Sequence, residues 1–259
     1  MTPADQHRFL TFADQLADAA RTAILPYFRA SHTVDHKGGA RFDPVTEADR
    51  GAERAMRALI EAEFPEHGIL GEEFGEKPSR SGYSWALDPI DGTRAFIAGL
   101  PLWGVLIALA HEGQPIIGVM DQPYLDERYK GWPGGASLSK AGETRALKTR
   151  ACASLSEAIV STTDPMLFAE SERASFQNLK PRLTRYGYDC YAYAMVAMGG
   201  VDIVVESGLR PWDIQALIPI IRGAGGDVTN WSGGDASQGG QVIAFGDRRA
   251  GEAAMKLLA

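Results

Sequence analysis

The sequence predicts an α/β protein in which an α+β lobe over residues 1–147 precedes an α/β lobe over residues 148–259. At the start of the chain, apolar residues recur at three- and four-residue steps, and short apolar runs follow them, which is typical of helices followed by a sheet. Beyond Lys148, short apolar runs alternate with helical patterns, which indicates a layered α/β lobe. Because no flexible linker is evident, we expect the two lobes to pack as one compact unit.

Two amphipathic helices are expected first. The helix over residues 3–28 should be distorted in its last turn by Pro26, because proline lacks the backbone donor that a helix needs. A polar, glycine-bearing loop over residues 31–43 leads to a second helix that Thr46 opens. The expected apolar face of this second helix consists of Ala52, Met56, Leu59, Ile60 and Phe64.

Strands fill the rest of the first lobe. Short apolar runs with flanking turn residues predict strands over residues 68–70 and 83–87. Two longer strands, over residues 102–110 and 115–120, flank a four-residue segment whose composition suits a hairpin turn.

In the second lobe, strands and helices are expected to alternate. The predicted strands cover residues 158–161, 201–205 and 241–245, and the predicted helices cover residues 166–179 and 189–198 together with one after the last strand. A further helix over residues 212–224 should be interrupted by Pro219 and should end at Gly225-Gly226.

Composition excludes several classes of protein. Lys and Arg number 26 against 33 for Asp and Glu, a formal charge of −7, and no basic run could displace counterions from nucleic acid. Cys152 and Cys190 are too few for a disulfide scaffold and lack zinc-site spacing. The polar N-terminus is unlike a signal peptide, and no apolar stretch approaches membrane-spanning length. We therefore expect a cytoplasmic protein without nucleic-acid or membrane partners.

Aromatic and histidine residues suggest packing and surface roles. Trp85, Trp103 and Trp231 are expected in the core, because aromatic side chains mostly serve burial. Four histidines in polar stretches lack metal-ligand spacing and are expected at the surface: His32, His36, His67 and His111.

An acidic motif follows the strand expected over residues 83–87. Asp88 and Asp91 lie three residues apart, Pro89 restricts the backbone between them, and Gly92 permits a tight turn. The residues after Gly92 can begin a helix whose exposed N–H groups point at an anion. On its own this motif is weak, because acidic residues commonly occupy turns and cap helices.

Further carboxylates could join the same site. Glu72 follows the strand over residues 68–70 and could reach the same sheet edge, whereas Asp213 starts a distant helix, where an ordinary N-cap is the alternative. Magnesium prefers oxygen ligands of this kind, and buried carboxylates without cations would repel one another. Thr46-x-x-Asp49 also fits a helix capping box, although a capped Asp49 could orient the hydroxyl of Thr93.

Together, these motifs resemble those of the inositol monophosphatase superfamily, in the same order and over nearly the whole chain. The segments that carry the resemblance are Thr46-x-x-Asp49, Gly71-Glu72-Glu73, Asp88-Pro89-Ile90-Asp91-Gly92-Thr93 and Trp212-Asp213. The resemblance implies a layered αβαβα sandwich of the inositol monophosphatase and sugar phosphatase type. Residues 91–96, 99–101, 186–193 and 213–220 are most similar to the histidinol-phosphate phosphatase branch.

The resemblance also implies roles for individual residues. Up to three Mg²⁺ ions per subunit would be held by Glu72, Asp88, the Ile90 carbonyl, Asp91 and Asp213. Asp49, Glu72 and Thr93 would be catalytic, with Asp49 and Thr93 activating or orienting the attacking water. The substrate would be bound by Asp91, Gly92, Thr93, Arg94, Asp189, Glu206 and Asp213. For Asp189, the alternative to substrate binding is a structural role as the cap of the helix that begins there.

The implied function is Mg²⁺-dependent hydrolysis of L-histidinol phosphate to L-histidinol and phosphate in histidine biosynthesis, by a cytoplasmic homodimer. An inositol-1-monophosphatase, or a broader sugar-phosphate or nucleotide 3'-phosphatase, would use the same residues. A catalytically silent phosphate-binding regulator is the alternative from another class. The full set of acidic ligands together with Thr93 argues against that regulator.

Overall fold

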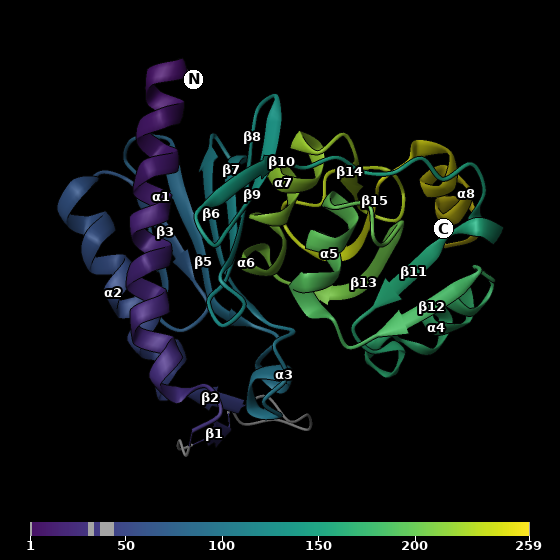
Figure 1. The fold of residues 1–259 in the computed structure, drawn as a ribbon, viewed down its shortest axis with the longest axis horizontal. Helices are drawn as coiled ribbons and strands as arrows, with labels where there is room; N and C mark the ends of the chain where they lie inside the picture. The colour runs from purple at the N-terminus through teal and green to yellow at the C-terminus, as the bar shows by residue number, and fades with distance from the viewer. Residues whose placement is uncertain (1, 31–33, 37–43, 259) are drawn as a thin grey trace.

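The computed structural model describes residues 2–30, 34–36 and 44–258, with side chains described for residues 2–30 and 47–258. Its elements form alternating layers: a helix pair, an eight-stranded sheet, central helices, a five-stranded sheet and outer helices (Figure 1). The expected αβαβα sandwich is therefore confirmed. The boundary between residues 147 and 148 stays a prediction.

The first layer consists of α1 (Pro3–Ile24) and α2 (Glu47–Glu63). Thr2 and Asp5 form a capping box at the start of α1, and a 3-10 helix at Leu25–Tyr27 replaces the last turn around Pro26, as expected. The expected apolar face of α2 is buried except for Leu59, which is 37% exposed, so its assignment to this face was wrong. Short strands β1 (Val34–His36) and β2 (Pro44–Thr46) pair antiparallel between the helices. The rest of the expected loop, residues 31–33 and 37–43, lies outside the described residues.

The eight-stranded sheet has the order β10-β9-β8-β7-β6-β5-β3-β4, and all of its pairs are antiparallel except β3 with β5. Its strands are β3 (Gly68–Gly71), β4 (Gly75–Lys77), β5 (Tyr83–Asp91), β6 (Gly104–His111), β7 (Gln114–Gln122), β8 (Glu127–Trp132), β9 (Gly135–Lys140) and β10 (Glu143–Ala146). The four predicted strands and the hairpin between β6 and β7 are confirmed. Strands β4, β8, β9 and β10 were not predicted, because charged and polar residues interrupt their apolar pattern.

Side chains alternate between the two faces of this sheet, as a period of two requires. On β6, Val105 and Ile107 pack with the helix pair, whereas Leu106 and Ala108 pack with the central helices. The sheet is therefore covered on both sides, which explains why its central strands are almost continuously apolar.

The central layer contains α5 (Asp189–Ala197), α6 (Pro211–Ile214) and α7 (Leu217–Gly223). The helix predicted over residues 212–224 is broken, but at Gln215-Ala216 rather than at Pro219. Pro219 lies in the first turn of α7, where its missing N–H has no helical acceptor to lose. Gly225, at φ +98°, follows the end of α7 as expected.

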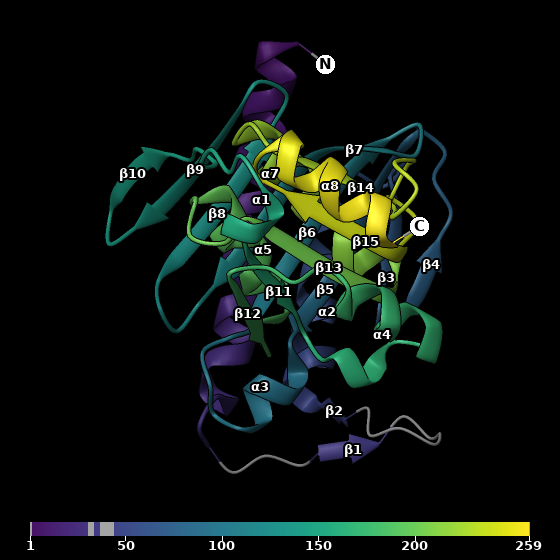
Figure 2. The ribbon, with the colours of Figure 1, turned by 90° about the vertical axis from the view of Figure 1, so that its right-hand side faces the viewer.

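The five-stranded sheet has the order β12-β11-β13-β15-β14. Its strands are β11 (Ile159–Thr162), β12 (Leu183–Tyr186), β13 (Ile203–Leu209), β14 (Asp227–Thr229) and β15 (Gly240–Phe245). Its outer face is covered by α4 (Glu170–Gln177) and α8 (Arg248–Leu258), which lie in front of it in Figure 2. The helix predicted over residues 166–179 is split, because extended Phe168 separates a 3-10 helix at Pro165–Leu167 from α4. Strands β12 and β14 were not predicted.

Trp85, Trp103 and Trp231, the tryptophans expected in the core, are buried. His67, expected at the surface, is instead 7% exposed; its ring stacks on Phe64 and Tyr83, and its Nδ1 accepts a hydrogen bond from Trp85 Nε1 at 3.1 Å. His111 is exposed as expected, and His32 and the side chain of His36 lie outside the described residues. Within the described part of the chain, no helix combines the length and apolar character needed to cross a membrane.

Candidate active site

The acidic motif lies on an irregular end of β5. The strand was expected to stop at Leu87, but it continues to Asp91, with a register shift against β6 between Asp88 and Asp91. Pro89 cannot donate to the sheet, and the N–H of Ile90 donates instead to Asp88 Oδ1 at 3.1 Å. Such a bulge redirects side chains, and it lets both aspartates of the motif contribute to one site.

Glu72 reaches the same sheet edge because β3 runs parallel to β5. Gly71 is paired with Leu87, and the N–H of Glu72 donates to the Leu87 carbonyl at 3.2 Å. Glu72 and Asp88 thus follow paired residues of neighbouring strands. This is the placement that the sequence predicted.

Asp213 approaches from the central layer. It is the third residue of α6, not the N-cap, and its carboxylate accepts a hydrogen bond from the N–H of the cap residue Arg210 at 2.7 Å. The N-cap alternative for Asp213 is therefore wrong, because the cap is Arg210, three residues earlier. The carboxylate still reaches the motif on β5, because α6 contacts that strand.

Carboxylate oxygens of Asp88, Asp91 and Asp213 all lie within 4.8 Å of one another. Burial raises the pKa of Asp88 well above its ordinary value, and the negative charges of Glu72, Asp91, Asp213 and Asp49 raise it further. Burial, Asp189 and Asp213 likewise raise the pKa of Asp91, although a hydrogen bond from the Cys190 N–H at 2.7 Å opposes the shift. An all-oxygen cluster of mutually repelling carboxylates fits hard divalent cations such as Mg²⁺.

The turn after Asp91 requires glycine. Gly92 has φ +87°, and a Cβ there would lie 2.8 Å from the Leu102 carbonyl oxygen. It caps α3 (Thr93–Ile97), whose first N–H groups have no acceptor within the helix and can face an anion. The Thr93 hydroxyl donates to the Ile90 carbonyl at 3.0 Å, so Ile90 rather than Asp49 receives this hydrogen.

Asp49 lies in the first turn of α2 and is 3% exposed. Its negative charge raises the pKa of Asp88, so the carboxylate belongs to the same acidic cluster. The side chain of Thr46 lies outside the described residues, and the capping box therefore stays a prediction.

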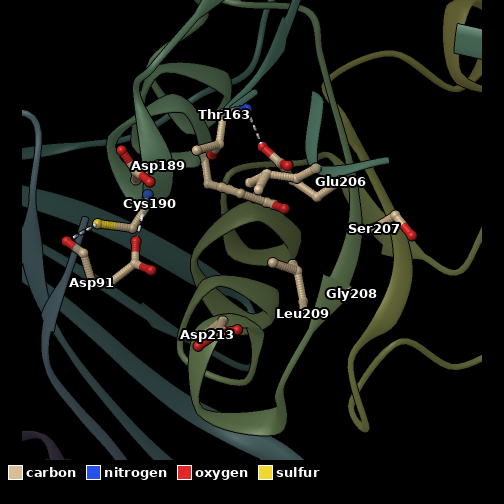
Figure 3. A pocket seen from close by; sticks show the side chains of 11 residues that line it. Asp91, Thr163, Asp189, Cys190, Glu206, Ser207, Gly208, Leu209 and Asp213 are labelled. Carbon is tan, nitrogen blue, oxygen red and sulfur yellow. Dashed lines mark hydrogen bonds between the residues drawn. The ribbon is translucent and has the colours of Figure 1, made fainter. Parts of the chain in front are cut away.

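A pocket of about 260 Å³ opens beside Asp91 and Asp213 (Figure 3). Asp189 on α5 and Glu206 on β13 face it from different elements. It is lined by Asp91, Thr163, Leu167, Asp189, Cys190, Tyr193, Glu206, Ser207, Gly208, Leu209 and Asp213. All the predicted substrate residues except Gly92, Thr93 and Arg94 line this pocket.

The pKa values of Glu206 and Asp189 are both raised. Burial raises the pKa of Glu206 to about 8, although its carboxylate accepts hydrogen bonds from the Thr163 N–H at 2.6 Å and the Thr162 hydroxyl at 3.2 Å. Burial also raises the pKa of Asp189 to about 6, against the opposing charge of exposed Arg94. Asp189 has φ +44° and is the first residue of α5, with Tyr188 as its cap, so the capping alternative is wrong.

Thr163 and Tyr193 line the pocket but were not expected there. Thr163 follows β11 and gave no signal in the sequence. Tyr193 lies four residues after Asp189, so helical periodicity could have placed both side chains on one face.

A family model described as "Inositol monophosphatase family" matches residues 5–258. The chain belongs to this family. Among relatives, a histidinol-phosphatase of Chlorobaculum parvum is 40% identical, over 86% of each chain. A bifunctional phosphatase of Arabidopsis thaliana, IMPL2, chloroplastic, is 44% identical, over 90% of this chain and 67% of that protein. A solved inositol monophosphatase structure from Zymomonas mobilis has a TM-score of 0.87 at 41% identity, covering 100% of this chain and 99% of that one.

Membership of the inositol monophosphatase family makes the chain a phosphatase with the observed layered fold. Enzymes of this family are metal-dependent, and the carboxylate cluster is a group that could hold the metal. Relatives named as histidinol-phosphatases and as inositol-1-monophosphatases occur at moderate identity.

Proposed function

We propose that the chain is a Mg²⁺-dependent phosphatase that hydrolyses L-histidinol phosphate to L-histidinol and phosphate. The observation that carries this proposal is the acidic lining of the pocket, where Asp189 and Glu206 stand beside the carboxylate cluster. L-histidinol phosphate has a cationic amine on its leaving group, and carboxylates form strong hydrogen bonds with such a cation. The positive charge would also favour the ionised form of Glu206, whose pKa burial raises to about 8. Relatives named as histidinol-phosphatases, up to 40% identical, support the same substrate.

The cations would be held by Glu72, Asp88, Asp91, Asp213 and the Ile90 carbonyl, and when bound they would neutralise phosphoryl oxygens and acidify a water. Gly92 and Thr93 would donate backbone N–H groups to the phosphate from the start of α3. The hydrogen of the Thr93 hydroxyl is directed to Ile90, which leaves the hydroxyl oxygen able to accept a hydrogen from the attacking water.

Asp49 would orient the same water from the first turn of α2. We propose direct attack by water, because each acidic residue of the cluster is assigned to binding cations or to orienting water. Trapping an aspartyl-phosphate during turnover would contradict this assignment.

Arg94 would help to bind the substrate from a neighbouring pocket, which shares Asp189 and Thr163 with the first. Its charge lowers the proton affinity of Asp189 and so keeps that carboxylate ionised for contact with the amine.

An inositol-1-monophosphatase is the second candidate, favoured by relatives of that name and by the Zymomonas mobilis structure. A polyol brings no positive charge for Asp189 to balance, and none to favour the ionised form of Glu206, whose pKa burial raises to about 8, which is why we rank this substrate second. A broader sugar-phosphate or nucleotide 3'-phosphatase would use the same carboxylate cluster.

The deciding experiment measures phosphate release from L-histidinol phosphate, inositol 1-phosphate and 3'-phosphoadenosine 5'-phosphate, each with Mg²⁺ and with EDTA. We expect the highest kcat/KM for L-histidinol phosphate and no turnover in EDTA. Faster release from inositol 1-phosphate would contradict the proposed substrate. Release that persists in EDTA would contradict the metal requirement, and no release from any ester would favour a silent regulator.

We further propose that the enzyme acts in histidine biosynthesis as a cytoplasmic homodimer. Both cysteines are free and buried, which suits a reducing compartment. Light scattering of the purified protein tests the assembly, and a monomeric mass at micromolar concentration would contradict it.

A further inference from the structure

Tyr193 is a pocket residue whose hydroxyl has no hydrogen-bond partner among the described residues. The residue is 3% exposed, and its ring packs in the core between the two sheets. A buried hydroxyl without a partner costs about 1 to 3 kcal/mol. This cost is avoided when a group inside the pocket forms the missing hydrogen bond.

The position of Tyr193 connects it to the leaving-group end of the pocket. Asp189 and Tyr193 are four residues apart on α5, so they project from the same face of this helix. Glu206 lines the same pocket from β13, and Asp91 and Asp213 line it beside the carboxylate cluster (Figure 3).

The phenol of Tyr193 stays protonated in this environment. Burial raises its pKa well above the ordinary value, and the negative charges of Glu206, Asp91 and Asp213 raise it further. A neutral hydroxyl can accept one hydrogen bond while it donates another. Carboxylates attract any cation, whereas a hydroxyl held by a buried ring also selects the position of the cation.

We propose that Tyr193 is a specificity-determining residue whose hydroxyl hydrogen-bonds to the amine on the leaving group of the substrate. The inference rests on the proposed function, because L-histidinol phosphate supplies that amine. The ammonium group carries three N–H donors, and Asp189, Glu206 and Tyr193 would be its acceptors. Tyr193 would therefore act on substrate choice and not on the attacking water.

The test compares Tyr193→Phe, which removes only the hydroxyl, with wild type on two esters that differ by the amine. These are L-histidinol phosphate and 3-(imidazol-4-yl)propyl phosphate. We expect the ratio of their kcat/KM values to fall about 10- to 100-fold in Tyr193→Phe, as expected for the loss of one hydrogen bond to a charged group, mainly through a higher KM for L-histidinol phosphate. The melting temperature should not fall, because the hydroxyl that is removed has no described protein partner.

Tyr129→Phe is the matched control. Tyr129 is also fully buried, but its hydroxyl donates to Glu127 at 2.9 Å, outside the pocket lining. This variant should lower the melting temperature and leave the substrate ratio at the wild-type value.

The outcomes separate the two proposals. If wild type does not favour L-histidinol phosphate over inositol 1-phosphate, the proposed function fails and the inference fails with it, before any variant is measured. If wild type has that preference and Tyr193→Phe keeps the ratio of the two esters, only the inference is overturned. An equal loss of kcat/KM for both esters would also overturn it, since that result indicates a structural role.

Discussion

At the scale of single residues, the candidate site depends on carboxylates that are held in place by backbone donors. The Cys190 N–H holds Asp91, the Arg210 N–H holds Asp213 and the Ile90 N–H holds Asp88. These bonds fix the positions of groups whose charges repel one another. Carboxylates that are held close together despite their mutual repulsion are expected at a site that binds cations.

Asp91→Asn tests this arrangement. The amide oxygen of asparagine can still accept the hydrogen bond from Cys190, so the fold should be retained. Loss of one cation-binding charge should lower kcat by about a thousandfold or more. Steady-state kinetics and circular dichroism check both parts, and near-normal turnover would contradict the proposed role of Asp91.

His67 should make folding stability depend on pH. Burial, helped by the positive charges of Arg8 and Lys77, lowers the pKa of His67 to about 4 from 6.5. The unfolded chain therefore binds more protons than the folded one between these values, so stability is full above pH 6.5 and is lost as pH falls towards 4. The loss should amount to about 3 kcal/mol at most.

Urea unfolding at pH 7 and pH 4.5 measures this loss, and His67→Phe should reduce the difference between the two values. Nuclear magnetic resonance should also detect the His67 ring titrating near pH 4. A ring that titrates at its ordinary pKa would contradict the buried position.

At the scale of elements, close packing of α7 on the first sheet positions the central layer. Gly118 on β7 and Gly131 on β8 lie directly under α7, and a Cβ at Gly118 would overlap the carbonyl of Ala216. Asp213 on α6 immediately precedes this contact. The distance between α7 and the first sheet therefore also affects how closely Asp213 approaches β5.

Gly118→Ala should push α7 away from the sheet. Overlap with backbone atoms cannot be relieved by a rotamer change, so we expect destabilisation by about 2 to 3 kcal/mol or more, together with a reduced kcat. Gly51→Ala is the control, because its Cβ would meet only Ala23 at 4.0 Å and lies within α2. That variant should gain about 0.5 to 1 kcal/mol from helix propensity. Equal effects in thermal unfolding would contradict the packing argument.

At the scale of the whole molecule, the acidic cluster joins residues from positions 49 to 213 of the chain and from several layers. Asp49 comes from α2, Glu72 follows β3, Asp88 and Asp91 belong to β5, and Asp213 belongs to α6. Only the folded chain can hold these groups together. Cation binding is therefore coupled to folding of the whole molecule.

Addition of Mg²⁺ should raise the melting temperature. At a hundredfold excess over Kd, a ligand of the folded state stabilises by about 2.7 kcal/mol. Asp213→Asn should weaken this response while keeping an acceptor for the Arg210 N–H, and without Mg²⁺ it should be as stable as wild type or more so. Asp227→Asn, at a surface ion pair with Arg222, should respond like wild type. An unchanged response in Asp213→Asn would contradict its place among the ligands.

Much of the fold could be predicted because local patterns dominate it. Helical periodicity predicted α1 and α2, and short apolar runs predicted β5 and β6; their buried residues agree with the prediction except for Leu59. Strands β8 to β10 were missed because charged and polar residues interrupt their apolar pattern, and pairing with neighbouring strands holds them in the sheet.

By itself, the sequence determined which residues could form helices and strands, where the acidic motif lies, and to which family the chain belongs. These are properties of neighbouring residues and their order. The tertiary structure alone decided that Asp213 meets Asp88 and Asp91 and that His67 is buried. It also decided that Tyr193 lines a pocket with a hydroxyl that has no hydrogen-bond partner in the described part of the chain. The reason is that burial and contacts between distant segments arise from tertiary packing, whereas the periodicity of apolar residues reports only on residues that are close in the sequence.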